Sequence, residues 1–333
     1  MSQERDPRPD VVRAARVGED GHGRDATRPQ EIPRAGWKDI LLRVKDGIKR
    51  DQIPLVAAGV AFYAMLALFP AMTALISLYG LVADPQQIQQ QIDDIAGDME
   101  GGAGDLISEQ AQTIAGAGTG ALTTGLAISI VAALWAASSG MQGLMLALTI
   151  ANNEEESRGL IKKRAIALGL TLVAIIVVIL AMGVIVVVPV ILQVAGLGQV
   201  GEWLVRILRW PLMGLVVVGV LASIYRIGPD RDQPKWRWVS PGAVVATVLW
   251  VLASIAFSVY VNNFGDYNET YGALGAVIVL LLWLFISAFV VLFGAELNAE
   301  MEHQTAEDTT AGDPQPMGQR DAEVADHVAD RPD

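Results

Sequence analysis

Residues 270–296 read TYGALGAVIVLLLWLFISAFVVLFGAE, and no residue between Glu269 and Glu296 is charged. The hydrocarbon core of a bilayer is about 30 Å thick and is crossed by about 20 helical residues. This stretch therefore predicts a membrane-spanning helix. The rest of the chain is similar in character, because 52% of its 333 residues are hydrophobic and only 18% are charged, against about 25% charged in a soluble domain. The composition predicts a polytopic membrane protein and excludes a soluble enzyme.

Six such charge-poor windows follow one another along the chain. They predict membrane spans at about 54–83, 122–149, 166–194, 205–226, 240–264 and 271–296. The fourth window differs, because its apolar part from Trp210 to Tyr225 would be only about 24 Å long as a helix. The expected fold class is all-α: a six-helix transmembrane bundle, with a membrane domain over residues 36–302.

The positions of Lys and Arg predict the orientation of this bundle. Twelve of them precede the first span, and the connections 150–164 and 226–241 carry four each, whereas 84–120 and 265–271 carry none. Positive residues collect on the cytoplasmic side of a membrane. Both termini are therefore expected in the cytoplasm of a bacterial cell, with the protein in the inner membrane as a multi-pass protein.

The polar segments outside the spans receive separate predictions. Residues 1–35 and the acidic segment 303–333 contain few large apolar residues, which predicts disordered cytoplasmic tails. Residues 37–50 combine helically spaced apolar residues with five basic ones, which predicts an interfacial helix on the anionic inner leaflet. The loop 84–120 is expected to form an acidic, Gln-rich helical hairpin outside the cell.

Several kinds of chemistry are excluded by composition. The chain has no cysteine, and its three histidines, His22, His303 and His327, lie outside the spans. Thiolate nucleophiles and Cys-ligated metals are thereby ruled out, and so is a histidine-ligated metal or haem inside the membrane. No metal and no cofactor are expected.

Polar residues recur on single faces of three predicted spans. They are Tyr63, Pro70, Thr73 and Ser77 in the first, Ser138, Gln142, Thr149 and Asn153 in the second, and Ser254, Ser258 and Asn262 in the fifth. Helical residues three or four apart share a face, and polar groups in hydrocarbon are costly. Two interpretations stay open: these residues join neighbouring helices by hydrogen bonds, or they line a polar groove that binds a substrate.

Arg206 and Arg209 form a second candidate binding site, at the outer end of the fourth span. They are the only basic residues expected on the outside. One interpretation is that both side chains extend to the outer phosphates of the bilayer. The other is that they face the bundle and receive an anionic group, since the arginine fork matches phosphate and carboxylate.

A few residues are candidates for structural roles. Gly272 and Gly275 allow the sixth span to approach a neighbour closely, and Pro70 is a further structural candidate in the first span. Glu296 leaves the membrane at the inner end of the sixth span. It is expected to pair with Arg226 or Arg237 on the same side.

The chain resembles the YihY/BrkB family of bacterial inner-membrane proteins over residues 37 to about 300. The resemblance rests on several motifs, namely Ala57 to Tyr63 with Phe69-Pro70, Leu134-Trp135 with Ser138, Leu208-Arg209-Trp210, Tyr225-Arg226, Trp236 to Gly242, Trp250, Tyr260, Tyr271-Gly272 and Gly294 to Asn298. It implies six spanning helices. Family members carry ribonuclease BN or virulence labels, and a related member is linked to movement of lipopolysaccharide precursors. The resemblance assigns no catalytic residues.

Three functions can be compared on these residues. The first is a transporter or flippase for an anionic lipid or amphipathic envelope molecule, with membrane lipids, anionic ones among them, as partners. The second is a non-transporting scaffold in envelope assembly that uses the external hairpin and the tails as contacts. The third, a hydrolase or ribonuclease, is disfavoured because no nucleophile–base pair or metal cluster is recognisable. No nucleic acid is expected as a partner, and neither substrate nor oligomeric state can be derived.

Overall fold

The computed structural model describes residues 21–82, 119–194, 198–263 and 273–330. Within them it gives the backbone alone for 73–82, 119–123, 178, 180–194, 198–210, 262–263 and 273. The predicted external hairpin at 84–120 and Gly272 therefore fall outside the described residues, apart from the start of one helix at Thr119.

Six long helices occupy the positions of the six predicted spans. They are α3 (Ile53–Val82), α6 (Thr119–Ala151), α7 (Leu160–Val194), α8 (Gly198–Ile227), α9 (Trp236–Asn263) and α11 (Ala273–Glu302). Among the residues with described side chains, α3, α6, α9 and α11 contain stretches long and apolar enough to cross a membrane. In α8 the apolar stretch is shorter, Pro211–Ile227. The all-helical class is thus confirmed for the described residues, and four of the predicted spans have the length and composition of a membrane helix.

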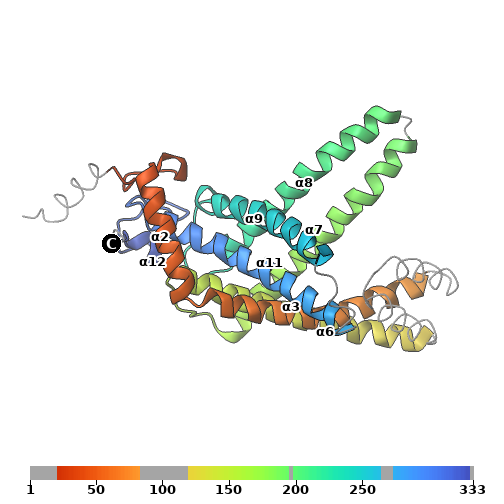
Figure 1. The fold of residues 1–333 in the computed structure, drawn as a ribbon. Helices are drawn as coiled ribbons and strands as arrows, with labels where there is room; N and C mark the ends of the chain where they lie inside the picture. The colour runs from red at the N-terminus through yellow and green to blue at the C-terminus, as the bar shows by residue number, and fades with distance from the viewer. Residues whose placement is uncertain (1–20, 83–118, 195–197, 264–272, 331–333) are drawn as a thin grey trace, which may run out of the picture.

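The helices are arranged as two hairpins and a central pair (Figure 1). The hairpin of α7 and α8 projects away from the hairpin of α3 and α6, while α9 and α11 lie between them at their common end. The described residues therefore do not confirm the single six-helix bundle that the sequence predicts. Large apolar side chains remain exposed along the helices, for example Leu55 (68%), Val131 (68%) and Leu215 (67%), as expected of surfaces that face lipid rather than water.

Helices α3 and α6 form the most extensive helix pair among the described elements. Small residues make this close approach possible: Ala57 and Ala61 are buried on α3, and Ala136 and Ala147 on α6. Gly140 lies on the same face of α6, where an added Cβ would come within 3.3 Å of the Tyr63 Cβ. Without a hydrophobic force between helices in lipid, such small-residue packing is the main source of association.

Helices α9 and α11 are joined by a glycine contact and an asparagine. Gly242 and Gly294 leave no room for a Cβ on either helix, because the carbonyl oxygen of the facing glycine and, at Gly294, also the Tyr225 hydroxyl occupy the space. Beside them Asn298 accepts a hydrogen bond from the Gly242 N–H (2.8 Å) and donates one to the Val239 carbonyl (3.0 Å). The amide of Asn298 therefore joins α11 to the turn of α9 that contains Pro241.

The basic helix predicted at 37–50 is α2 (Arg34–Arg50), which runs across the ends of α3 and α11 (Figure 1). Part of its apolar face packs against other helices. Ile40 and Val44 are buried with Trp238, Leu297 and Met301 in one cluster. The basic residues Lys38, Lys45 and Lys49, together with Leu41, lie on the exposed side. The prediction of a helix is correct, but the helix is held by α9 and α11.

The two polar tails differ from the prediction of disorder wherever the structure describes them. Residues 21–33, with the short helix η2 (Pro29–Glu31), and residues 303–330, with α12 (Glu323–Asp326), pack at the end of the molecule near α2. The Thr305 hydroxyl donates to the Ala26 carbonyl (2.7 Å), and the Lys235 N–H donates to the Thr309 carbonyl (2.8 Å). The tail has little apolar surface, yet its polar groups find partners in distant segments. We call this assembly of residues 21–33, 152–159, 228–235 and 303–330 the polar cap.

Candidate functional site

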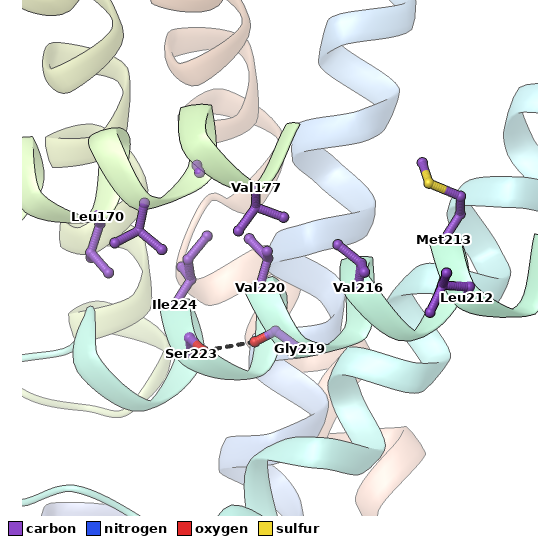
Figure 2. A pocket seen from close by; sticks show the side chains of 11 residues that line it. Leu170, Val177, Leu212, Met213, Val216, Gly219, Val220, Ser223 and Ile224 are labelled. Atoms are coloured by element: carbon purple, nitrogen blue, oxygen red, sulfur yellow. Dashed lines mark hydrogen bonds between the residues drawn. The ribbon is translucent and has the colours of Figure 1, made fainter. Parts of the chain in front are cut away.

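An apolar groove lies between α7 and α8 (Figure 2). It encloses about 550 Å³. The residues that line it are Leu170, Val173, Ala174 and Val177 on α7, and Leu212, Met213, Val216, Gly219, Val220, Ser223 and Ile224 on α8. The hydroxyl of Ser223 donates to the Gly219 carbonyl (2.7 Å) and so presents little polarity to the groove.

The dimensions of this α7–α8 groove match a lipid chain. From Leu212 to Ile224 the groove follows α8 over 12 residues, or about 18 Å. Half of the hydrocarbon core of a bilayer is about 15 Å. The groove therefore has the length of an acyl chain in one leaflet, and its wall offers such a chain apolar contact.

The backbone of α8 extends well beyond its apolar stretch. The helix begins at Gly198, so Arg206 and Arg209 are helical residues rather than part of a loop. They lie about 30 Å and 26 Å along the helix from Arg226. By helical spacing, Arg209 has the same register as Met213, Val216 and Val220, which line the groove. The side chains of both arginines are outside the described residues, and their role in binding stays a prediction.

The polar residues of α6 bond mainly within their own helix. Ser138 is fully buried, and its hydroxyl donates to the Trp135 carbonyl (3.0 Å). The amide of Gln142 donates to the Ser138 carbonyl (3.3 Å), and Thr149 donates to the Met145 carbonyl (3.0 Å). These bonds lie within α6, so they neither join neighbouring helices nor show a polar groove, and both interpretations of this stripe stay predictions.

The polar residues of α9 contribute to a cross-helix cluster with α11. The Trp283 indole N–H donates to the hydroxyl of Ser254 (3.4 Å), and the Trp250 indole N–H donates to the hydroxyl of Ser287 (3.0 Å). The two indole rings lie 6.0 Å apart between centroids. Ser254 therefore joins two helices. Further along α9, Ser258 is exposed, and the side chain of Asn262 is not among those described.

The remaining candidates occupy separate places. Tyr63 packs edge-on against Phe62, with ring centroids 5.6 Å apart, and lies beside Gly140. Pro70 lines a second apolar groove of about 630 Å³ between α3 and α6, beside Trp135. Gly275 is buried near the start of α11. The predicted residues are thus not brought together around one polar cavity in the part of the chain that the structure describes.

Charged side chains gather instead at the end of α11 that meets the polar cap. Glu302 and Arg231 form an ion pair at 2.9 Å, with side chains 2% and 1% exposed. The Thr309 hydroxyl donates to Glu302 (2.6 Å), and Arg231 also donates to the side chain of Asn152 (2.7 Å). One buried pair therefore connects α6, the α8–α9 connection, α11 and the tail.

Glu296 has no such partner. Its carboxylate oxygens are fully buried and accept no hydrogen bond from any described residue. The predicted pairing with Arg226 or Arg237 is wrong, because Arg226 donates to the Pro234 carbonyl (3.0 Å) and stacks over the Trp236 ring at 4.7 Å, and Arg237 is exposed. Arg226 thus stabilises the turn into α9 instead.

A second polar cluster fixes the connection between α6 and α7. The backbone N–H and the hydroxyl of Ser157 donate to Asp230 (2.7 and 2.6 Å), and Arg158 donates to Glu156 (2.7 Å). Burial opposes ionisation of Asp230, but the Ser157 hydrogen bonds and the Arg158 charge outweigh it and lower the pKa of this carboxyl. The connection is therefore held by an ionised carboxylate at neutral pH.

The fold and these features define the class: an α-helical membrane protein with apolar grooves between its helices and a folded polar cap at one end. The profile of the virulence factor BrkB family matches residues 44–318. The chain therefore belongs to this family, as its motifs predict. Among the described residues, no group of three or more His, Asp or Glu is arranged to hold a metal ion.

Known proteins are similar to the chain to different extents. The ribonuclease-like protein YfkH of Bacillus subtilis is 31% identical over 260 residues, which cover 73% of this chain and 88% of that protein. A UPF0761 membrane protein of Xanthomonas oryzae pv. oryzae is 37% identical over 102 residues, or 30% of this chain and 24% of that protein. The chain thus matches about a quarter of the length of this second relative. No solved structure matches the chain.

Proposed function

We propose that this protein transports or flips an anionic lipid, or an amphipathic envelope molecule with an anionic head, across a bacterial inner membrane, and that it is not an enzyme. The observation that carries this proposal is the α7–α8 groove. It is apolar and about 18 Å long, and it lies along two helices that the sequence predicts to be membrane spans. A chain in this groove would leave its head group near the N-terminal half of α8.

The arginines of α8 supply the second element of the proposal. Arg206 and Arg209 continue the register of the groove-lining residues toward the N-terminus of the helix. A guanidinium there would offer a phosphate or carboxylate two parallel hydrogen bonds. An acyl chain in the groove and an anionic head at the arginines together form an amphipathic molecule. Its tail would stay in lipid while the head crosses.

The orientation of the protein is part of the same proposal. The polar cap and α2 would lie in the cytoplasm, since the basic residues collect on that side. The chain has no cysteine, so a single Lys45→Cys substitution on the exposed side of α2 gives a unique label site. A membrane-impermeant maleimide added to intact spheroplasts should leave this site unlabelled and should label it after lysis. Labelling in intact spheroplasts would reverse the orientation.

Transport can be tested in vesicles that contain phosphatidylglycerol with a fluorescent head group. Dithionite added outside bleaches only the outer leaflet, so transfer from the inner leaflet extends the bleaching. We expect transfer with the wild type and slower transfer with Gly219→Trp, which fills the groove. Gly214→Trp is the matched control, because Gly214 lies on the same helix, also has open space around it and does not line the groove. Equal rates in the two variants, or transfer no faster than in protein-free vesicles, would overturn the proposal.

The contribution of the arginines needs its own comparison. Native mass spectrometry of the detergent-extracted protein should find an anionic lipid on the wild type and none on the Arg206→Gln/Arg209→Gln variant. The same variant should slow transfer of labelled phosphatidylglycerol more than transfer of labelled phosphatidylcholine. Equal retention and equal rates would reduce both arginines to interfacial anchors.

The scaffold alternative makes a different prediction. Deletion of residues 86–115 would then abolish the protein's role in envelope assembly in cells, while Gly219→Trp would leave that role unchanged. The two patterns are opposite to those expected of a transporter, so one set of variants separates the two functions.

A further inference from the structure

Glu296 differs from every neighbouring acidic residue. Glu300, one turn further along α11, receives the Arg43 guanidinium at 2.6 Å. Glu302 is paired with Arg231, and Asp51 is paired with Arg50 at 2.9 Å. Glu296 is as buried as these groups, yet both of its oxygens lack a hydrogen-bond donor among the described residues. Each of these neighbouring carboxylates thus has a partner, and within the described part of the chain Glu296 has none.

The position of Glu296 is between two packed helices. It faces Gly47 of α2, where an added Cβ would overlap with the Oε1 atom. Gly47 therefore gives the carboxyl group the space that it occupies. Ile40 and Val44 dock α2 on α11 on one side of this contact, and the α2–α3 turn closes it on the other.

The charges around the group do not favour a carboxylate. The charged residues that act on it most strongly are Asp51 and Glu300, which have its sign, and Arg50, which opposes it. Arg50 is already bonded to both oxygens of Asp51 and is mostly exposed. An isolated buried carboxylate is strongly unfavourable, and such groups become neutral instead. The neutral acid is the form that this space accommodates.

We propose that Glu296 is a proton-binding site, and that release of its proton to water separates α2 from the end of α11. The ionised group would be unpartnered and would repel Asp51, so it could remain buried only at high cost. The turn between the helices is suited to this motion, because Gln52 has a left-handed backbone (φ 50°) that a side chain rarely adopts. A small change there would swing α2 about the start of α3.

If the protein moves a lipid, this site would make that movement sensitive to the pH on the side of α2, and this last step rests on the proposed function. The site itself does not. It would exist and respond to pH whether or not the protein moves a lipid, and it is therefore tested without a transport assay.

The first measurement is infrared spectroscopy of the full-length protein in lipid vesicles over a range of pH. We expect the C=O stretch of one carboxylic acid at neutral pH, its loss at alkaline pH, and its absence in Glu296→Gln. Glu307→Gln is the control, because Glu307 is an exposed acid in the tail, and it should keep the band. A wild-type spectrum without a carboxylic acid band, or an unchanged band in Glu296→Gln, would overturn the proposal.

The second measurement follows α2. An environment-sensitive fluorophore on Lys45→Cys should change its emission between neutral and alkaline pH, with the same midpoint as the infrared band. The added Glu296→Gln substitution should abolish this change, since glutamine is a neutral mimic of the bound-proton state. A fluorescence change that persists in Glu296→Gln would refute the coupling to α2. A cation site would instead show a sodium-dependent response and no acid band, which also overturns the proposal.

Discussion

The polar cap makes a sharp prediction about trypsin. Arg320 is 5% exposed, and its guanidinium donates to the carbonyl groups of Ala306, Glu307 and Ala325. Trypsin must bind an extended arginine side chain, so this site is inaccessible while the tail is folded. A disordered acidic tail, which the composition suggests, would be cut there at once. Full-length protein in detergent should therefore resist cleavage at Arg320.

The perturbation that opens the cap is Glu302→Gln. It leaves Arg231 buried with only neutral partners. Breaking a buried ion pair by removing one partner costs about 3–5 kcal/mol, and we take about 3 kcal/mol because glutamine can still accept hydrogen bonds from Arg231 and Thr309. At 1.4 kcal/mol per factor of ten, the open state becomes roughly 150-fold more populated.

The assay is the rate at which the peptide 321–333 appears, followed by mass spectrometry. When reclosing is faster than cleavage, this rate follows the population of the open state. We expect an increase of about two orders of magnitude in Glu302→Gln and no change in Glu307→Gln, which removes the same charge from an exposed position nearby. Rapid cleavage of the wild type, or equal protection in Glu302→Gln, would show that the ion pair does not hold the tail.

Three further predictions concern the helices and their connections. Asn298→Ala should lower the free energy of unfolding by about 2 kcal/mol, seen as a lower thermal midpoint, whereas Thr247→Val, which removes only a bond within α9, should change it by less than half as much. Gly140→Leu should separate α3 from α6 and reduce the yield of monodisperse protein, while Gly125→Leu on the same helix, where space is open, should not. Because the pKa of Asp230 is lowered in the folded state, its stabilising effect is present above about pH 3.9 and is lost as the pH falls through the folded value. Asp230→Asn should therefore destabilise by about 1.5 kcal/mol at pH 7 and match the wild type in acid, as measured by the unfolding midpoint.

The positions of the helices could be derived from sequence because one physical rule sets them. A charge-free run must be helical to satisfy its backbone in lipid. Helices α3 and α9 begin and end within a few residues of their predicted bounds, whereas α11 continues beyond Glu296 to Glu302. How the helices pair follows from a different property, the placement of small residues. The contacts of Gly140, Gly242 and Gly294 show this placement. Glycine is frequent in membrane spans, however, so its position in the sequence does not predict which helix it packs against.

The roles of the polar residues are harder to predict from sequence. A polar side chain in a span can form its hydrogen bonds within its own helix or with groups outside that helix. Gln142 and Ser138 use carbonyl groups of their own helix, which a sequence pattern cannot distinguish from a polar groove. The apolar α7–α8 groove leaves no signal of its own, since Val173 or Val216 would look the same against lipid.

The C-terminal tail and Glu296 both depend on side-chain partners that the sequence composition does not predict. Composition measures how much apolar surface a segment can bury, and by that measure residues 303–330 should be disordered. Their order comes from charges and hydroxyl groups that meet partners more than 200 residues away, such as Thr305 with Ala26. Glu296 and Glu302 look alike in the sequence. The fold places the side chain of Glu302 against Arg231 and the side chain of Glu296 against Gly47. It is this difference in partners, invisible along the chain, that makes Glu302 a structural residue and Glu296 the residue to examine for proton binding.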